Sequence, residues 1–296
     1  MAKTNEGCTS LVCGPVAHEV HMRLSGPPKA NDYVRINSTF HSLGGSGAFA
    51  ALALAARGIK VTLLSPKPVD EYALKIETIL ANRGIRWTGI CETGTLPVFY
   101  SIYEPSGTRW IIHERVLIQS QWLPKHIDSD FVMLYPTAPE TAIKIAEMAR
   151  NNRTPLVFCP NASLLPSLST FTAIAKESSW VIVNAEEARG YTSCASTKDA
   201  LAAMTDMCPN IVITQGSNEV ILFTGGVKYS VDITPVERSI NAGDGDIAAA
   251  VFSAGMFAQG LCAVESLERT QAVVGRFLTR GELSLESPAV FDLLKL

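Results

Sequence analysis

Residues 239–246 read Ser-Ile-Asn-Ala-Gly-Asp-Gly-Asp, and an apolar stretch that predicts a helix follows at once. The small residues Ala242 and Gly243 stand directly before Asp244, so successive backbone N–H groups can point into one space at the helix N-terminus. Such a position attracts an anion, because unpaired amides and the helix dipole both favour negative charge. We interpret Asp244 as a general base that takes a proton from a hydroxyl while the amides hold a phosphoryl group. The alternative is that Asp244 only caps the helix.

Polar residues also follow two other apolar, strand-like runs. Asn184 and Glu187 lie three residues apart, so they share one face of a helical first turn. Taken alone, this spacing favours a capping box, in which the two side chains satisfy backbone N–H groups reciprocally. Further along, Gly216 after Thr214 would let a nucleotide approach the backbone closely, although Thr-x-Gly is also ordinary turn chemistry.

The composition argues against several classes of function and site. The net charge is −3 and the pI is about 6.0, so neither nucleic acid nor a membrane surface is an expected partner. The seven cysteines form no Cys-x-x-Cys pair, and we interpret them as reduced thiols of a cytoplasmic protein. No signal segment and no apolar run of about 18 residues is visible, which favours the same location. The five histidines show no metal-ligand spacing, so a structural metal is not expected.

Strand and helix patterns alternate along the chain. Expected strands cover residues 10–13, 61–65, 131–135, 155–159, 180–184 and 210–214, with hairpins at 98–113 and 220–231; expected helices cover 47–57, 70–82, 139–151, 169–176, 198–207 and the region after 245. Because the strands are apolar throughout and helices separate them, the pattern predicts an α/β fold with a mostly parallel sheet covered on both faces. We expect a single domain, residues 1–296, with a small β-sheet lid formed by about 15–40 and 96–115.

Four short motifs carry a resemblance to a known family, in that family's order. They are Gly44-Gly45-Ser46-Gly47-Ala48, Asn184-Ala185-Glu186-Glu187, Thr214-Gln215-Gly216-Ser217 and Asn241-Ala242-Gly243-Asp244. The chain resembles ribokinase-type (PfkB-type) carbohydrate and nucleoside kinases, and the resemblance extends over almost its whole length. It implies a ribokinase-like fold and ATP-dependent phosphorylation of an alcohol. An oxidoreductase is rejected, because the glycines do not form Gly-x-Gly-x-x-Gly and no acidic residue ends the strand expected at 61–65.

The resemblance also implies a catalytic loop. Asp244 is the base in this comparison, and Asn241, Ala242 and Gly243 complete the anion-binding segment. Asn241 replaces the family's usual Gly, but Asn tolerates unusual backbone angles. Asp246 stands where the family usually has an apolar residue; it either adds a second carboxylate to the site or lies on the outer face of the helix.

Nucleotide and metal contacts are implied in the same way. Asn184 and Glu187 organise the waters of the Mg²⁺ that arrives with ATP, so Glu187 acts on the metal indirectly, through water. Thr214 and Gly216 approach the nucleotide, and residues 231–236 and 273–281 surround its base. Some relatives also bind K⁺ through backbone carbonyls near the anion-binding loop, which leaves no signature in side chains.

The expected substrate side departs from the family pattern. Ser46 stands where the family often has Lys, and Phe49 where it has an Asn that holds substrate hydroxyls. Glu19 is the acid nearest to the family's sugar-gripping Asp; otherwise it is a solvated residue after a strand. Arg109 matches the family's Gly-x-Arg in the lid and is either structural or reaches the substrate. The candidate substrate residues are Glu19, Gly44, Gly45, Ser46, Phe49 and Arg109.

Aromatic residues of the expected lid leave two interpretations open. Phe99, Tyr103 and Trp110 either stack over a ring-bearing substrate or, as we prefer, pack on the core or on the lid of a second copy. The resemblance favours a homodimer formed through the lid. The resulting hypothesis is an ATP-dependent kinase that phosphorylates a hydroxyl of a small polar molecule, a sugar or sugar-like ring. A nucleoside kinase and a non-catalytic ligand-binding member of the fold are the alternatives.

Overall fold

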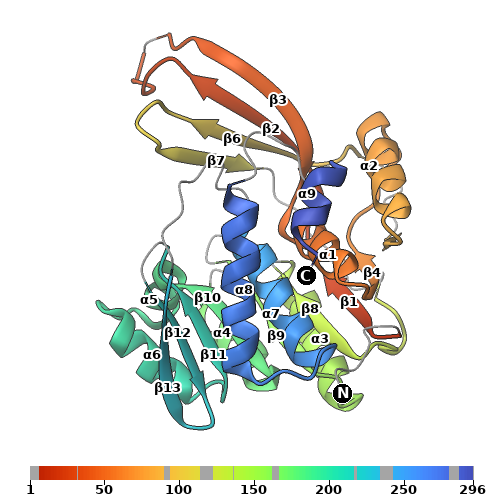
Figure 1. Cartoon of the computed structure of the whole chain (residues 1–296), viewed down its shortest axis with the longest axis vertical. Coiled ribbons are helices and arrows are strands. Elements are labelled where there is room, and N and C mark those ends of the chain that lie inside the picture. Colours follow the sequence, from red (N-terminus) through yellow and green to blue (C-terminus); the bar gives the residue numbers. More distant parts are fainter. Residues whose placement is uncertain are drawn as a thin grey trace.

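The computed structural model describes residues 7–31, 33–89, 94–113, 123–135, 137–161, 167–216, 219–233, 243–279 and 287–295. Within them, nine strands form a large sheet and four form a small one (Figure 1). The order in the large sheet is β13 (Val227–Asp232), β12 (Glu219–Thr224), β11 (Ile211–Thr214), β10 (Trp180–Asn184), β9 (Leu156–Phe158), β8 (Phe131–Leu134), β1 (Thr9–Cys13), β4 (Lys60–Leu64) and β5 (Arg86–Thr88). All are parallel except at one edge, where β12 runs antiparallel to both of its neighbours.

Helices cover both faces of the large sheet. One core is shared by α1 (Ser46–Ala56), α2 (Glu71–Asn82), α7 (Asp244–Phe257), α8 (Ala263–Leu278) and α9 (Pro288–Leu293), and the other by α3 (Pro139–Asn151), α4 (Leu168–Glu177), α5 (Ala185–Thr192) and α6 (Thr197–Thr205). Alternate side chains of β8 enter opposite cores: Phe131 and Met133 the first, Val132 and Leu134 the second. This arrangement confirms the predicted α/β fold. Among the described helices, none is both long and apolar enough to cross a membrane.

Most element boundaries follow local signals, and two elements escaped prediction. Asp70, Ser167, Ser196 and Ser287 each accept the backbone N–H three residues further on and so begin a helix. The helix expected at 139–151 and the strand expected at 180–184 have the predicted limits. The short strand β5 has only three residues, and the polar helix α5 lacks a clear apolar period, so β5 gave no sequence signal and α5 gave only the capping-box spacing at its start.

The small sheet projects from one end of the α/β body (Figure 1). Its order is β3 (Ile36–Gly44), β2 (Ala17–Leu24), β6 (Val98–Tyr103) and β7 (Arg109–His113). Strands β2 and β6 are parallel, whereas the two outer pairs are antiparallel. Strand β3 continues to Gly44, beyond the limit near residue 40 expected for the lid. The first glycine of the early motif is therefore part of the small sheet.

Two glycines allow the end of β1 to touch the start of α1. A Cβ on Gly47 would lie 2.6 Å from the carbonyl carbon of Gly14 and 2.7 Å from its oxygen. A Cβ on Gly14 would in turn lie 2.7 Å from the Cβ of Tyr135. Such distances are well inside van der Waals contact, so side chains at these positions would push the backbone apart.

We expect Gly47→Ala to lower the free energy of unfolding by about 1–3 kcal/mol, because overpacking against a backbone is not relieved by a rotamer change. Gly190→Ala is the matched control: Gly190 is also helical, and a Cβ there meets nothing within 4 Å. The control should gain about 0.5–1 kcal/mol, the usual advantage of Ala over Gly in a helix. Urea unfolding measures both, and equal effects of the two substitutions would contradict the packing argument.

Candidate active site

Several parallel strands end at one edge of the large sheet and place the predicted residues there. The last residues of β1, β8, β10 and β11 are Cys13, Leu134, Asn184 and Thr214. Because these strands run in the same direction, the turns that follow them meet at their carboxyl ends. Ligands of open α/β sheets bind in the crevice at such an edge.

Helix α7 begins at this edge with Asp244. Gly243 is its N-cap residue and has φ 76°, a left-handed conformation that glycine adopts without strain. A Cβ on Gly243 would lie 2.4 Å from Cδ2 of Phe49, a buried residue of α1. Two separate constraints therefore require glycine at position 243: the left-handed backbone conformation and the lack of space for a Cβ beside the Phe49 ring. Asn241 and Ala242 lie outside the described residues.

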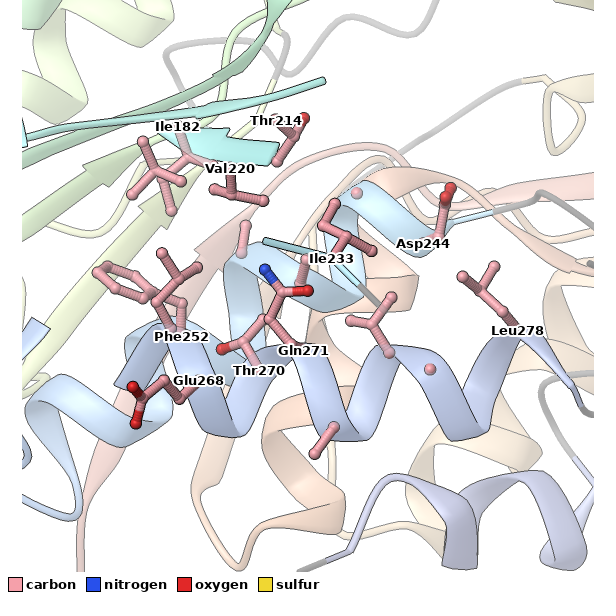
Figure 2. A pocket seen from close by; sticks show the side chains of 18 of the residues that line it. Ile182, Thr214, Val220, Ile233, Asp244, Phe252, Glu268, Thr270, Gln271 and Leu278 are labelled. Carbon is pink, nitrogen blue, oxygen red and sulfur yellow. The ribbon is translucent and has the colours of Figure 1, made fainter. Parts of the chain in front are cut away.

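A cavity of about 500 Å³ lies between α7, α8 and the ends of β10–β12. Thr214, Gly216 and Asp244, predicted from three separate motifs, all line it. Most of the wall is apolar, with Val220 and Phe252 as examples. In Figure 2, Asp244 stands at one end of the space and Glu268 at the other, with the Gln271 side chain between them. The size of this cavity and its mostly apolar wall, with polar side chains at the ends, suit a small ligand that has an apolar face and one polar end.

Asn184 and Glu187 form the capping box that their spacing predicts. The Asn184 side-chain oxygen accepts the backbone N–H of Glu187 at 2.8 Å, and a Glu187 carboxylate oxygen accepts the backbone N–H of Asn184 at 3.0 Å. Burial raises the pKa of Glu187 to about 7, although the hydrogen bonds from Asn184 act in the opposite direction. A carboxyl that titrates near neutral pH at a cleft edge is a candidate functional group.

Asp246 is partly buried at the start of α7, so its alternative place on the outer face of the helix is wrong. Burial raises the pKa of its carboxyl to about 8, and the carboxylates of Asp244 and Glu187 act in the same direction. Glu19 adds to this effect, while Arg109 opposes it. The last two residues belong to the small sheet, so charges of that sheet act on the carboxyl of Asp246.

Glu19 and Arg109 meet on one face of the small sheet. Glu19 is only 3% exposed, so it is not the solvated residue of the alternative interpretation. Its Oε1 accepts a hydrogen bond from Ser101 and lies 3.5 Å from Nη2 of Arg109, which also donates to Ser101 at 3.0 Å. Gly44 leaves the necessary room, since a Cβ there would lie 2.7 Å from the Cβ of Glu19. The buried carboxylate of Glu19 in β2 thereby connects this strand to β6 through Ser101 and to β7 through Arg109.

The remaining candidates occupy different surroundings. Gly45 is the N-cap residue of α1 with φ 94°, and a Cβ there would lie 2.4 Å from the carbonyl oxygen of Pro15. Ser46 is the first residue of α1. Phe99 contacts His113, whereas Trp110 is 48% exposed and donates its indole N–H to Glu104 at 2.6 Å. Phe49 packs beneath Gly243, as described above.

Three residues of the site gave no usable sequence signal. Ser101 lies between Tyr100 and Ile102 in β6, and only its hydrogen bond in the folded protein shows that it contacts Glu19. The Tyr135 hydroxyl donates to the backbone oxygen of Asp246 at 3.2 Å, across 111 residues of sequence. Gln271 has a buried side-chain nitrogen with no hydrogen-bond partner among the described residues. Such contacts depend on folding, and single-sequence patterns do not report them.

No group of three or more His, Cys, Asp or Glu side chains in the described parts of the chain is arranged to hold a metal ion directly. The edge of the sheet combines a helix N-terminus, a carboxylate and a cavity, and a helix N-terminus favours an anionic ligand.

The family model for pfkB family carbohydrate kinases matches residues 124–280, which is more than half of the chain. The chain belongs to this family. A comparison with curated proteins found no match.

Solved structures resemble the whole chain at low sequence identity. The Methanocaldococcus jannaschii nucleoside kinase, an archaeal member of the ribokinase family, is 17% identical with a TM-score of 0.80, and the match covers 98% of both chains. The Cryptococcus neoformans ribokinase in complex with ADP is 16% identical with a TM-score of 0.80, covering 97% of this chain and 98% of that one. The Burkholderia thailandensis nucleoside kinase in complex with inosine is 16% identical with a TM-score of 0.76, covering 92% of each. The likeness confirms the ribokinase-like fold.

We expect Asp246→Asn to stabilise the protein most at high pH. The pKa of this carboxyl is raised on folding from its ordinary value of 3.8 to about 8, so folding becomes less favourable as the pH rises between these two values, where the unfolded chain loses a proton that the folded protein keeps. The amide removes this cost, and the gain should be about 1–3 kcal/mol at pH 9 and smaller at pH 5. Chemical unfolding at the two pH values measures it.

The matched control is Asp199→Asn. Asp199 is the third residue of α6, as Asp246 is of α7, but it is exposed and hydrogen-bonded to Ser196. This variant should show no gain at high pH. A lower stability of Asp246→Asn than of the wild type at pH 9 would show that the carboxylate is stabilised in a way that burial does not predict.

Proposed function

We propose that this protein is an ATP-dependent kinase that phosphorylates a hydroxyl of a small polar acceptor. The observation that carries the proposal is the position of Asp244: it begins α7, follows a left-handed Gly243 and lines a cavity shared with Thr214 and Gly216. A carboxylate in this place can accept a proton beside bound phosphate. Family membership supports the same reaction, and the similar ribokinase that was solved with ADP supports the choice of nucleotide.

Asp244 takes the acceptor hydroxyl proton as the acceptor oxygen attacks the terminal phosphorus of ATP. A bond forms between that oxygen and phosphorus, the bond from phosphorus to the bridging oxygen breaks, and ADP leaves. Backbone N–H groups at the start of α7, including the proposed contributions of Asn241, Ala242 and Gly243, stabilise the transferring group. The small sheet shields the reaction from water, which suppresses ATP hydrolysis.

The cavity between α7 and α8 is the proposed nucleotide site. Thr214 and Gly216 lie where the phosphates and ribose approach the sheet edge, and apolar residues such as Ile233 and Val274 suit the face of a base. Ile233 and Val274 fall within the segments expected to surround the base. Gln271 lines the cavity, and its side-chain nitrogen has no hydrogen-bond partner in the part of the chain that the structure describes. Residues 234–236 and 280–281 of those segments lie outside the described residues.

Mg²⁺ supplies charge neutralisation of the ATP phosphates in this proposal. Asn184 and Glu187 would hold its waters from the neighbouring strand end, with Glu187 still able to use the carboxylate oxygen outside the capping box. K⁺ held by backbone carbonyls near the start of α7 belongs to the same proposal. The need for each ion is tested by measuring turnover with Mg²⁺ or K⁺ left out of the assay.

The acceptor is proposed to lie between α7 and the small sheet. Glu19, Arg109, Gly44, Gly45 and Ser46 border this side, and Asp246 adds a carboxyl there. A sugar or sugar-like ring suits this polar surface. A nucleoside remains the alternative, because nucleoside kinases are among the similar structures, although Phe49 is occupied in packing against Gly243. A non-catalytic ligand-binding protein is the second alternative.

The six free cysteines among the described residues agree with the proposed cytoplasmic location.

We expect Asp244→Asn to lower turnover by roughly 100-fold or more, because the variant lacks the proton acceptor, while ATP affinity stays near that of the wild type. ADP release from Mg-ATP is measured with a panel of sugars, amino sugars, cyclitols and nucleosides, and ATP binding by calorimetry. Asp199→Asn, a first-turn carboxylate of α6, is the control and should keep its turnover. Normal turnover of Asp244→Asn removes this residue from the role of base. ATP binding without turnover by the wild type, across the panel, favours the non-catalytic alternative.

We propose further that two copies associate through the small sheet. Tyr100, Trp110 and Ile112 lie on its face opposite Glu19 and are 38%, 48% and 58% exposed. An apolar sheet face of this kind is commonly covered by a partner.

Light scattering should give a mass of twice 31.8 kDa for the wild type at micromolar concentration. Trp110→Asp should shift the protein towards the monomer, because a charge in an apolar interface is poorly solvated. A wild-type monomer under these conditions would contradict the proposed association.

A further inference from the structure

The small sheet holds four of the five histidines of the chain. His18 and His21 belong to β2, His41 to β3 and His113 to β7. His18 and His41 lie on the face opposite Glu19, because β2 side chains alternate and His41 is paired with Val20. There they meet α2, which lies beside the base of the small sheet (Figure 1).

Three rings form a stack at this contact. The ring of His18 lies between those of Tyr72 and His41, with centroid distances of 3.8 Å and 4.9 Å and interplanar angles of 20° and 19°. The Nε2 of His18 is also 2.8 Å from the Nδ1 of His41, which is a hydrogen-bond distance. Tyr72 belongs to the first turn of α2, so the stack connects this helix to two strands of the small sheet.

Backbone contacts connect the same three elements. Asp70 caps α2 by accepting the N–H of Ala73 at 2.8 Å, and its second carboxylate oxygen accepts the N–H of Leu96, just before β6. The N–H of His18 donates to the carbonyl of Pro97 at 2.9 Å. The start of α2 and the start of β6 therefore fix the strand segment that carries His18.

The groups that face His18 favour its neutral form. Burial lowers the pKa of His18 and His41 acts in the same direction; Asp70 opposes this effect, and Lys75 adds a smaller lowering. Lys75 pairs with Glu71 at 2.6 Å and lies over the Tyr72 ring. On the β6 side, the residue paired with His18 is the apolar Val98. Protonation of His18 is therefore opposed first by its burial and then by its contact with His41.

We propose that His18, His41 and Tyr72 form a proton-sensitive latch that holds the base of the small sheet against α2. A nitrogen-to-nitrogen hydrogen bond needs one proton between the two rings, so the neutral pair and the singly protonated pair both maintain it. After a second proton is taken up, both facing nitrogens carry hydrogen and both rings are charged, which breaks the contact. Stability from the neutral His18 is present above the ordinary pKa of 6.5 and is lost as the pH falls below it.

The latch gives His18 a positioning role in the proposed kinase. His18 is the neighbour of Glu19, and Ala17, one residue earlier, is paired with Gly44. Release of the latch therefore moves the strand segment that sets Glu19 against Ser101 and Arg109. This consequence for the acceptor rests on the proposed function, whereas the latch itself does not.

Hydrogen exchange on the ligand-free protein tests the latch without any kinase assay. Between pH 7.5 and 5.5, after correction for intrinsic exchange, wild-type protection of residues 17–24 should fall by about tenfold relative to β8, since one linked proton supports at most tenfold per pH unit. His18→Phe should show no such fall, because phenylalanine keeps the stack on Tyr72 and takes up no proton. His113→Phe, the control in another strand of the same sheet, should behave like the wild type.

Equal pH dependence in the wild type and in His18→Phe overturns the proposal. If His18→Phe does not fold, His18→Gln makes the same test. The Gln side-chain amide donates to His41 and takes up no proton, so the fall should disappear. An unchanged fall overturns the proposal.

A kinetic measurement then separates positioning from simple stability. The acceptor KM of the wild type should rise from pH 7.5 to 5.5 more than that of His18→Phe, with parallel changes of kcat in the two proteins. If the protein is an active kinase but protection of residues 17–24 does not fall with pH, the latch is wrong and the proposed function stands. If protection falls as expected but no kinase activity is found, the latch stands and the proposed function is wrong.

Discussion

The N-termini of α1 and α7 meet at the edge of the sheet because glycines stand wherever a side chain would collide. Gly47 lies against the backbone of Gly14, and Gly243 lies against the ring of Phe49. Interiors are close-packed and do not absorb even one additional carbon at such distances without movement. The direction in which α7 leaves the edge, and with it the position of Asp244, depends on these contacts.

Carboxyl groups are concentrated where α7 begins. The carboxyl of Asp246 is buried near Asp244 and Glu187, and burial raises the pKa of both Asp246 and Glu187 towards or above neutrality. A protein selected only for stability would not keep such groups, since each costs free energy when it ionises. The helix dipole compensates part of the charge, and the proposed Mg-ATP complex would change the balance further by bringing a cation to the same edge.

The small sheet has two chemically different faces, and strand register assigns each residue to one of them. One face carries Glu19, Ser101 and Arg109, two of whose charges act on the carboxyl of Asp246. The other carries His18 and His41 at its base and exposed apolar residues beyond them. A slip of one residue in β2 would exchange the two sets. The position of Glu19 in the site and the contact with α2 are consequently properties of the same pairing.

Local sequence patterns determined the order and type of most elements, because apolar runs, caps and glycine turns act over a few residues. They also identified Asp244, Thr214 and Gly216, since each follows or precedes such a run, and the structure brings these three to one cavity. The Asn184–Glu187 capping box was predictable for the same reason. Tertiary structure alone decided that Asp246 is buried, that Phe49 lies beneath Gly243 and that His18 stacks between Tyr72 and His41. These outcomes join residues far apart in the chain, and the burial and pairing that create them arise only when the elements pack.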